Sequence, residues 1–357
     1  MGAGPPDVSP TARRIGRILI GAVWVGLGLA AARLVREAAV AWGPWKVYSA
    51  QAGVAIHVLE DSINADDPLL GWKHVPGRSV AMPVLGPDVV WTINANGFRG
   101  DRDVAMAVPP GRRRVIALGD SFTFGNVRAD ETWPALLEAR LPASEVVNMG
   151  ASAYGVDQMY LWYRESGAVL APEVVVLALI GDDLRRATLD RWASGHGRPL
   201  FRWTGDALVL TNVPVPPRIP PGQPLTGSWG FVRFLATRVV RGEAPPADPT
   251  VPIHVVDALA RLVRERGGHL LVVFLPVREG DAEGWAGRLR EAARAGGWAF
   301  ADLESAFLAR QGGGARSLSD TWFRPDGHYN AEGNAVVADE VARQLVSLGW
   351  WPPSAVP

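Results

Sequence analysis

The chain has 357 residues, 48% of them hydrophobic, which is enough to bury the core of one large domain or two ordinary ones. Its 36 Lys and Arg residues balance its 36 Asp and Glu residues, and this argues against nucleic-acid binding, because such proteins normally carry a basic excess. The absence of cysteine excludes disulfides, cysteine-ligated zinc and thiol chemistry.

The N-terminus has the pattern of a membrane segment. An arginine-rich start that ends at Arg17 precedes an uncharged run, residues 18–32. Basic residues before a span favour the cytoplasm, so we expect residues 1–43 to form a cytoplasmic tail and a single-pass transmembrane helix in the inner membrane. The rest of the chain is then periplasmic or otherwise extracytoplasmic. The alternative is a cleaved signal peptide and a secreted protein, since Ala30-Ala31-Ala32 resembles a cleavage site.

Residues 44–112 form a leader with few helix signals. A strand is expected at residues 89–93, where β-branched and aromatic side chains are concentrated, and a turn at residues 94–100, which are rich in Asn and Gly. We expect this leader to pack on the main domain. A lid or a substrate platform is the alternative interpretation.

Residues 113–350 alternate between strand and helix patterns. The expected strands are residues 115–118, 146–147, 174–180, 270–275 and 298–301, and the expected helices are residues 131–141, 156–168, 252–266, 284–295 and 331–348. This alternation predicts a three-layer α/β/α fold with a mainly parallel, five-stranded sheet of the flavodoxin-like kind. Functional sites in such folds lie beyond the carboxyl ends of the strands.

One stretch, at about residues 185–250, interrupts this alternation and is rich in Pro, Gly and Trp. Long irregular segments are uncommon in compact domains and are usually functional or mobile. We therefore expect an insertion here, either a lid over the site or a mobile loop.

A serine stands where the first expected strand ends, in the sequence Gly119-Asp120-Ser121. This place puts a hydroxyl at the mouth of the sheet, where backbone N–H groups of the turn can face an oxyanion. A serine hydroxyl is a weak nucleophile on its own and needs a base that a third group orients.

The base that fits best is His328, one of six histidines. It lies between the last strand and the last helix, in a loop that can fold back over the sheet edge towards Ser121. Asp326 is two residues away, near enough to hold the imidazole in one tautomer. The sequence therefore predicts that Ser121, His328 and Asp326 come together as a catalytic triad.

Together these motifs resemble the SGNH (GDSL) hydrolase superfamily. Gly119-Asp120-Ser121 matches its first block, and the pair Asp326 and His328 matches its last. The spacing of one residue between the acid and the histidine is similar to that of membrane-anchored bacterial envelope members, which include the alginate O-acetylation proteins. The resemblance runs from about Gly71 to Leu348 and implies a serine esterase or acyltransferase.

The family's oxyanion hole has three donors, which the resemblance transfers with two departures. The first is the backbone N–H of Ser121. The second is a glycine N–H in the family, and here it corresponds to Ala153, with Gly150 as the other match. The third is an asparagine side chain, but Asp182 occupies its position. An ionised carboxylate cannot donate a hydrogen bond, so Asp182 contributes only if it is protonated or not at all.

Three functions remain open from the sequence. The first is an extracytoplasmic ester hydrolase acting on acyl or O-acetyl esters, and the second is an O-acyltransferase that modifies a cell-envelope polysaccharide. The third is a non-catalytic carbohydrate-binding or scaffold protein, suggested by the changes at Ala153 and Asp182. No cofactor or metal is expected, since no residues have ligand spacing and no Gly-rich nucleotide loop follows the first strand.

Overall fold

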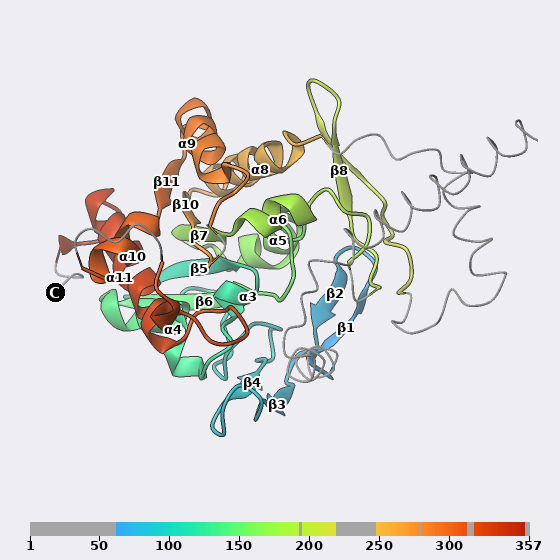
Figure 1. The fold of residues 1–357 in the computed structure, drawn as a ribbon. Helices are drawn as coiled ribbons and strands as arrows, with labels where there is room; N and C mark the ends of the chain where they lie inside the picture. The colour runs from blue at the N-terminus through green and yellow to red at the C-terminus, as the bar shows by residue number, and fades with distance from the viewer. Residues whose placement is uncertain (1–61, 193–194, 219–247, 279, 313–317, 354–357) are drawn as a thin grey trace, which may run out of the picture. The chain divides into compact units, whose positions relative to one another are not determined.

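The computed structural model of the chain describes residues 62–192, 195–218, 248–278, 280–312 and 318–353 (Figure 1). The expected transmembrane helix in residues 1–43 lies outside these ranges. Within them, no helix combines the length and the apolar composition needed to cross a membrane.

A parallel sheet forms the centre of the described chain. Its five strands are β5 (Arg113–Gly119), β6 (Ser144–Gly150), β7 (Val174–Leu179), β10 (His269–Phe274) and β11 (Ala299–Asp302). They pair in the order β11-β10-β7-β5-β6, so the chain moves outward from β5 first to one side and then to the other (Figure 1). The switch point lies between β5 and β7, and sites in such sheets form at its carboxyl end.

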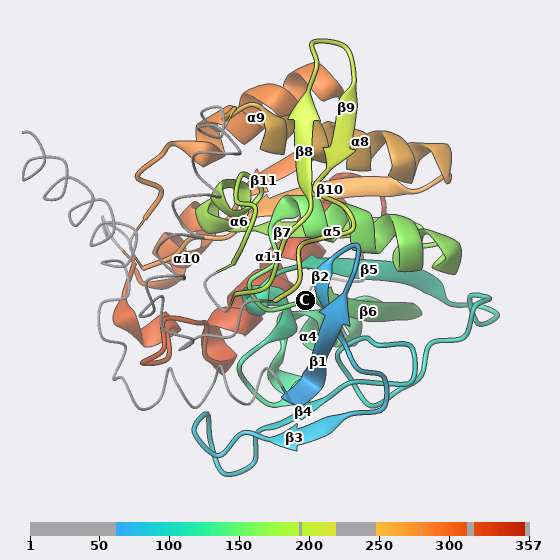
Figure 2. The same cartoon turned by 90° about the vertical axis from the view of Figure 1, so that its right-hand side faces the viewer.

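Helices cover both faces of the sheet, which gives the predicted three layers (Figures 1 and 2). One face carries α5 (Val156–Trp162), α8 (Val251–Glu265) and α9 (Trp285–Gly296), and the other carries α4 (Trp133–Arg140), α10 (Glu304–Arg310) and α11 (Ala331–Ser347). Successive side chains of a strand point to opposite faces. Accordingly Ile116 and Leu118 belong to the first core, and Val115 and Ala117 to the second.

The sheet and the five helices expected from the sequence are confirmed, except that α5 ends at Trp162, whereas the sequence predicted a helix over residues 156–168. Three further helices were not expected, namely α3 (Ser121–Phe124), α6 (Gly181–Arg186) and α10. Each spans two turns or fewer, which is too short to show helical periodicity. The described residues also contain four single turns: η1 (Ala129–Glu131), η2 (Tyr163–Gly167), η3 (Ala168–Leu170) and η4 (Asp320–Trp322).

The described part of the leader forms two antiparallel hairpins, of which only the last strand was predicted. They are β1 (Asn64–Asp67) with β2 (Gly71–His74), and β3 (Ser79–Ala81) with β4 (Val90–Thr92). Leu70 and Trp72 are buried in the same core as Ile116. Farther on, the Arg99 N–H donates to the Asn148 carbonyl of β6 at 3.1 Å. The leader therefore packs directly on the sheet domain.

The described part of the insertion contains a hairpin that the sequence did not predict, β8 (Leu200–Trp203) with β9 (Leu208–Thr211). Figure 2 shows it rising beside α8. The Trp203 ring stacks on His254 of α8, with ring centroids 3.8 Å apart. After the hairpin, the Val215 N–H donates to the Pro68 carbonyl of the leader at 2.8 Å. The insertion thus contacts both the helical layer and the leader.

A buried ion pair lies at the amino end of the sheet. Arg114 of β5 is fully buried and donates to the Glu145 carboxylate of β6 at 2.7 Å and to the Leu170 carbonyl at 2.6 Å. Because Ser121 follows the other end of β5, this pair is remote from the candidate site.

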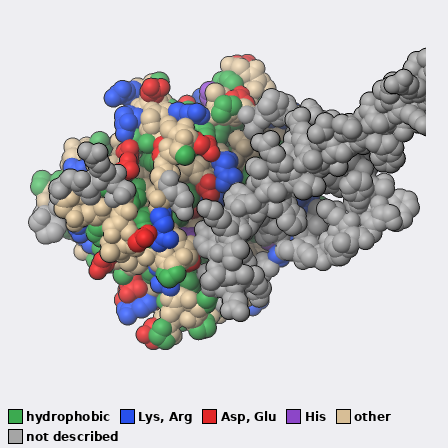
Figure 3. Space-filling model, viewed as in Figure 1, with side chains coloured by type: hydrophobic (Ala, Val, Ile, Leu, Met, Phe, Trp, Pro, Cys, Tyr) green, Lys and Arg blue, Asp and Glu red, His purple; other side chains and the backbone are tan. Residues whose placement is uncertain are grey.

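On the outside, Lys and Arg side chains are interspersed with Asp and Glu on the described face in Figure 3.

We predict that His74 makes the fold sensitive to acid. Burial lowers the pKa of this imidazole from its usual 6.5 to about 4, so folding favours its neutral form. Its contribution to stability is complete above the unfolded pKa and is lost as the pH falls towards the folded pKa. Between about pH 7 and pH 5 the free energy of unfolding should fall by about 2 kcal/mol from this group alone.

Urea denaturation of the wild type and of His74→Gln at both pH values measures this effect. The variant should lack that part of the fall, whatever its stability at neutral pH. An equal fall in both proteins would show that His74 does not cause it.

Candidate active site

Ser121 is placed by the tight junction between β5 and α3. The Asp120 carboxylate caps α3 by accepting from the Phe122 N–H at 2.8 Å, and Ser121 is the first residue of that helix. Gly119 is required just before, since a Cβ there would lie 2.1 Å from Thr123 Oγ1 and 2.8 Å from the Ala178 carbonyl oxygen. Ser121 itself is only 8% exposed, so most of this residue is covered by its neighbours.

His328 is presented by a turn between η4 and α11. Gly327 has a φ of 87°, a left-handed conformation that glycine adopts without a Cβ clash. The Arg324 N–H donates to the His328 carbonyl at 2.7 Å, which closes the turn. Next to it, the buried Tyr329 ring lies 4.9 Å from Phe122 and anchors the turn over α3.

These two segments bring the three predicted residues together. The distance from Ser121 Oγ to His328 Nε2 is 2.8 Å, a hydrogen bond. On the other side of the ring, His328 Nδ1 lies 3.4 Å from Asp326 Oδ2. For Nε2 to accept the serine proton, the proton of neutral imidazole must be on Nδ1, where Asp326 can accept it.

Asp326 is held in its ionised form. Burial by itself raises the pKa of this carboxyl group, but the hydrogen bond to His328, its charge and the Asn126 amide outweigh it and lower the pKa to about 2. The carboxylate is therefore available to stabilise a positively charged imidazole at any pH near neutrality.

Asn126 is a neighbour of this pair that the sequence analysis missed. It is 2% exposed, and its amide nitrogen donates to Asp326 Oδ2 at 3.1 Å while lying 3.2 Å from His328 Nδ1. The amide thus fixes the carboxylate beside the imidazole. It follows Ser121 by five positions, in the loop after α3, so the Gly119–Ser121 motif itself gave no sign of it.

Two of the predicted oxyanion donors have unpaired backbone N–H groups. Within the described residues, neither the Ser121 N–H nor the Ala153 N–H has a hydrogen-bond partner. Ala153 has a φ of 61°, the left-handed region that non-glycine residues rarely enter. The alanine at this family glycine position therefore keeps a glycine-like backbone.

Gly150, the other match for the second donor, is not available. Its N–H already donates to Asn148 Oδ1 at 2.9 Å. Its lack of a side chain serves packing instead, because a Cβ there would lie 2.1 Å from the Phe124 backbone nitrogen of α3. Of the two candidates that the sequence left open, only Ala153 has a free N–H.

Asp182 lies in the first turn of α6 as an acceptor of ion pairs. Its side chain is 48% exposed and lies 2.7 Å from the Arg185 guanidinium and 3.7 Å from that of Arg186. The Asp182 side chain is thus paired with two arginines. The fully buried carboxyl group is that of the next residue, Asp183.

Arg186 bridges the ends of β5 and β7 beneath the site. Its Nη1 atom lies 2.9 Å from Asp120 Oδ2 and 2.6 Å from Asp183 Oδ1. All three side chains are buried. Burial and the nearby Asp120 carboxylate raise the pKa of Asp183 well above its ordinary range. One guanidinium therefore joins the Asp120 carboxylate, which caps α3, to the carboxyl group of Asp183 at the start of α6.

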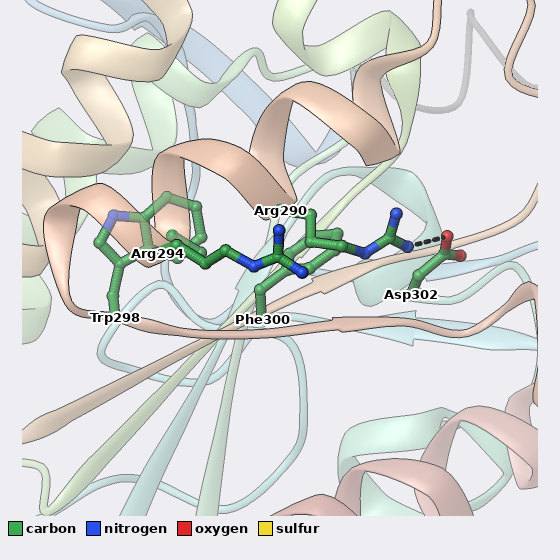
Figure 4. Close-up of a pocket in the computed structure, with 6 residues that line it drawn as sticks. Arg290, Arg294, Trp298, Phe300 and Asp302 are labelled. Carbon is green, nitrogen blue, oxygen red and sulfur yellow. Dashed lines mark hydrogen bonds and ion pairs between the residues drawn. The ribbon is translucent and has the colours of Figure 1, made fainter.

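A surface pocket of about 280 Å³ lies elsewhere, along α9 and β11 (Figure 4). It is lined by Arg290, Ala293, Arg294, Trp298, Phe300 and Asp302. The Arg290–Asp302 ion pair, at 3.1 Å, spans one end of it. None of these residues contacts the three site residues. Among the residues that the structure describes, no group of side chains is arranged to hold a metal ion.

We predict that Arg186→Met strongly destabilises the protein. It would leave Asp120 and Asp183 buried without a counter-ion, and removing one partner of a buried ion pair typically costs about 3–5 kcal/mol. The control is Arg185→Met one position earlier, which removes only an exposed pair with Asp182 and should cost about 1 kcal/mol or less. Urea denaturation measures both, and equal losses would contradict the assigned role of Arg186.

Several solved structures are similar to this chain. A search of curated proteins gave no match. Among solved structures, a GDSL-like lipase from Bacteroides thetaiotaomicron is 14% identical, with 66% of this chain and 89% of that chain covered and a TM-score of 0.40. An acetyl xylan esterase, AlAXEase, is 16% identical (65% and 99% covered, TM-score 0.42). An acetylxylan esterase from Geobacillus stearothermophilus, solved as a catalytic mutant, is 12% identical (67% and 96%, TM-score 0.41).

The assignment comes from the comparison with family models. The model of the GDSL-like Lipase/Acylhydrolase family matches residues 117–336, more than half of the chain. The matched range includes Ser121, Asp326 and His328, which the structure places together. The chain belongs to the GDSL-like lipase/acylhydrolase family.

Proposed function

We propose that the chain is an extracytoplasmic serine hydrolase that cleaves acyl or O-acetyl esters through an acyl-Ser121 intermediate. The observation that carries this proposal is the 2.8 Å contact between Ser121 Oγ and His328 Nε2. A nucleophile within hydrogen-bond reach of an oriented base is the arrangement that acyl transfer requires.

In the first half of the reaction, Ser121 Oγ attacks the ester carbonyl carbon, and His328 Nε2 takes the hydroxyl proton. Asp326 stabilises the imidazolium that forms, and the oxyanion accepts hydrogen bonds from the Ser121 and Ala153 N–H groups. When the tetrahedral intermediate collapses, its bond to the leaving oxygen breaks. His328 returns the proton to that oxygen, so an alcohol leaves and acyl-Ser121 remains.

In the second half, water attacks the acyl carbon and gives its proton to His328 Nε2. The same two N–H groups stabilise the second oxyanion. The bond to Ser121 Oγ then breaks, His328 protonates the serine, and the carboxylic acid is released. Every proton is thus carried by one ring nitrogen.

The finer parts of the proposal rest on sequence features. The arginines and the uncharged run in residues 1–43 support an inner-membrane anchor with the hydrolase on the outer side, or a secreted protein if that segment is cleaved. The Asp-x-His spacing supports an acetylated polysaccharide as substrate, as in the alginate O-acetylation branch. An O-acyltransferase would use the same acyl-serine and pass it to a sugar hydroxyl in place of water.

We predict that Ser121→Ala and His328→Ala abolish both labelling by a fluorophosphonate probe and turnover of p-nitrophenyl acetate. Asp326→Asn should lower kcat by about 10²–10⁴, because the imidazole loses the partner that fixes its tautomer. Circular dichroism of each variant controls for folding. A folded wild type with neither labelling nor turnover would refute the hydrolase and leave the non-catalytic binding role.

We also predict that Asp182→Asn raises kcat with little change in KM. Asparagine would supply the amide donor that the family has at this position, and one oxyanion donor is typically worth about 10²–10³ in rate. The exposed pairing of residue 182 with Arg185 should limit the gain to about tenfold. Asp182→Leu is the control, since it removes the carboxylate and its ion pair with Arg185 without adding a donor. An equal gain in the control would assign the effect to the lost negative charge.

A further inference from the structure

The loop of residues 152–154 carries the Ala153 N–H and is held by three side chains from distant parts of the chain. The carbonyls of Ser152, Ala153 and Tyr154 each accept a hydrogen bond from one of them. The donors are Trp72 of the leader, Arg198 of the insertion and Arg186 of α6. Three consecutive carbonyls bound by side chains leave this loop little freedom to rotate.

Trp72 holds the peptide group that contains the Ala153 N–H. Its indole Nε1–H donates to the Ser152 carbonyl at 3.3 Å, and this carbonyl belongs to the same peptide group as the Ala153 N–H. In return, the Tyr154 hydroxyl donates to the Trp72 carbonyl at 2.6 Å. A donor on one side of a peptide group fixes its plane and strengthens the N–H on the other side.

Arg198 holds the next peptide. Its Nη1 donates to the Ala153 carbonyl at 3.1 Å, and its Nη2 lies 3.1 Å from Asp157 Oδ1 of α5. Neither side chain of this ion pair is exposed. Burial raises the pKa of Asp157 and lowers that of Arg198, so the pair is costly to bury. A costly pair beside the open N–H points to a role other than stability.

The backbone at Ala153 needs such support. A left-handed conformation costs a non-glycine residue about 1–2 kcal/mol, and the φ of 61° here persists only if its surroundings impose it. Trp72 and Arg198 lie on either side of the Ala153 Cα, one on each flanking peptide. Together they determine the direction of the N–H bond between them.

We propose that Trp72 and Arg198 are positioning residues for the oxyanion hole, through which the leader and the insertion hold the Ala153 N–H towards the developing negative charge. This inference rests on the proposed hydrolase function. It assigns to two segments outside the central sheet a part in the reaction.

The first test is Trp72→Phe in the full-length chain, which removes the indole N–H and keeps an aromatic ring. Its matched control is Trp162→Phe, because Trp162 lies in the same core and packs on the same Tyr154 ring, with no partner for its Nε1 among the described residues. With p-nitrophenyl acetate, Trp72→Phe should lower kcat about tenfold and change KM less than about twofold. Trp162→Phe should leave both close to wild type.

A transition-state analogue separates positioning from general loosening. Trifluoroacetophenone adds to an active serine and forms an oxyanion in the hole. Its inhibition constant should weaken in Trp72→Phe by the same factor as kcat falls, and should not change in Trp162→Phe. A loss of stability alone would move the melting temperature and neither of these constants.

The second test is Arg198→Lys, since one ammonium cannot reproduce the paired contacts to the Ala153 carbonyl and to Asp157. Arg114→Lys is its control, because Arg114 is an equally buried, ion-paired arginine at the far end of β5. Both variants should lose stability, and only Arg198→Lys should show the fall in kcat with weaker binding of the ketone.

Failure of the proposed function and failure of this inference give different results. If the folded wild type neither labels with the fluorophosphonate nor turns over the ester, the proposed function fails and this inference fails with it. If the wild type is active but Trp72→Phe matches Trp162→Phe and Arg198→Lys matches Arg114→Lys, the inference alone is overturned.

Discussion

A single guanidinium joins the carboxyl ends of β5 and β7. Arg186 contacts both Asp120 and Asp183, and each of these carboxylates also accepts from a backbone N–H, that of Phe122 in α3 and that of Ile180 before α6. The starts of the two helices are therefore fixed relative to each other by one buried charge. Because Ser121 is the first residue of α3, the position of the proposed nucleophile depends on this bridge. The switch point of the sheet, where the strand order reverses, is therefore also the place where Arg186 joins two acidic side chains.

The sequence was sufficient to predict the sheet, because its strands are uninterrupted apolar runs such as Val174–Leu179. It also predicted that Ser121, Asp326 and His328 would meet, since a strand end and a late loop converge in this topology and the two motifs resemble one family. It could not predict Asn126, Trp72 or Arg198. Their partners are 200, 80 and 45 residues away, and no local pattern encodes such contacts. Short helices were missed for the related reason that one turn carries no periodicity.

Two residues, Ala153 and Asp182, depart from the family pattern of the oxyanion hole, and each has a defined place in the structure. Ala153 keeps the backbone conformation of a glycine, and Asp182 is engaged with Arg185 and Arg186 at the surface. The proposed oxyanion hole is then built from peptide N–H groups, whose direction is set by the groups that bind the neighbouring carbonyls. Trp72 precedes the segment 117–336 that matches the family. The part of the chain that shapes the site therefore extends beyond residues 117–336, which match the family model.

The contact of Arg99 with Asn148 has a further consequence. β6 is the last strand on its side of the sheet, and an uncovered edge strand offers its peptide groups to any other extended chain. The leader occupies part of this edge through the Arg99 N–H, and the buried Arg99 guanidinium donates to the carbonyls of Val90 and Val127, which ties the leader to the loop after α3. The segment that supplies Trp72 therefore also covers part of the edge strand β6, so protection of that edge and the geometry of the site depend on the same stretch of chain.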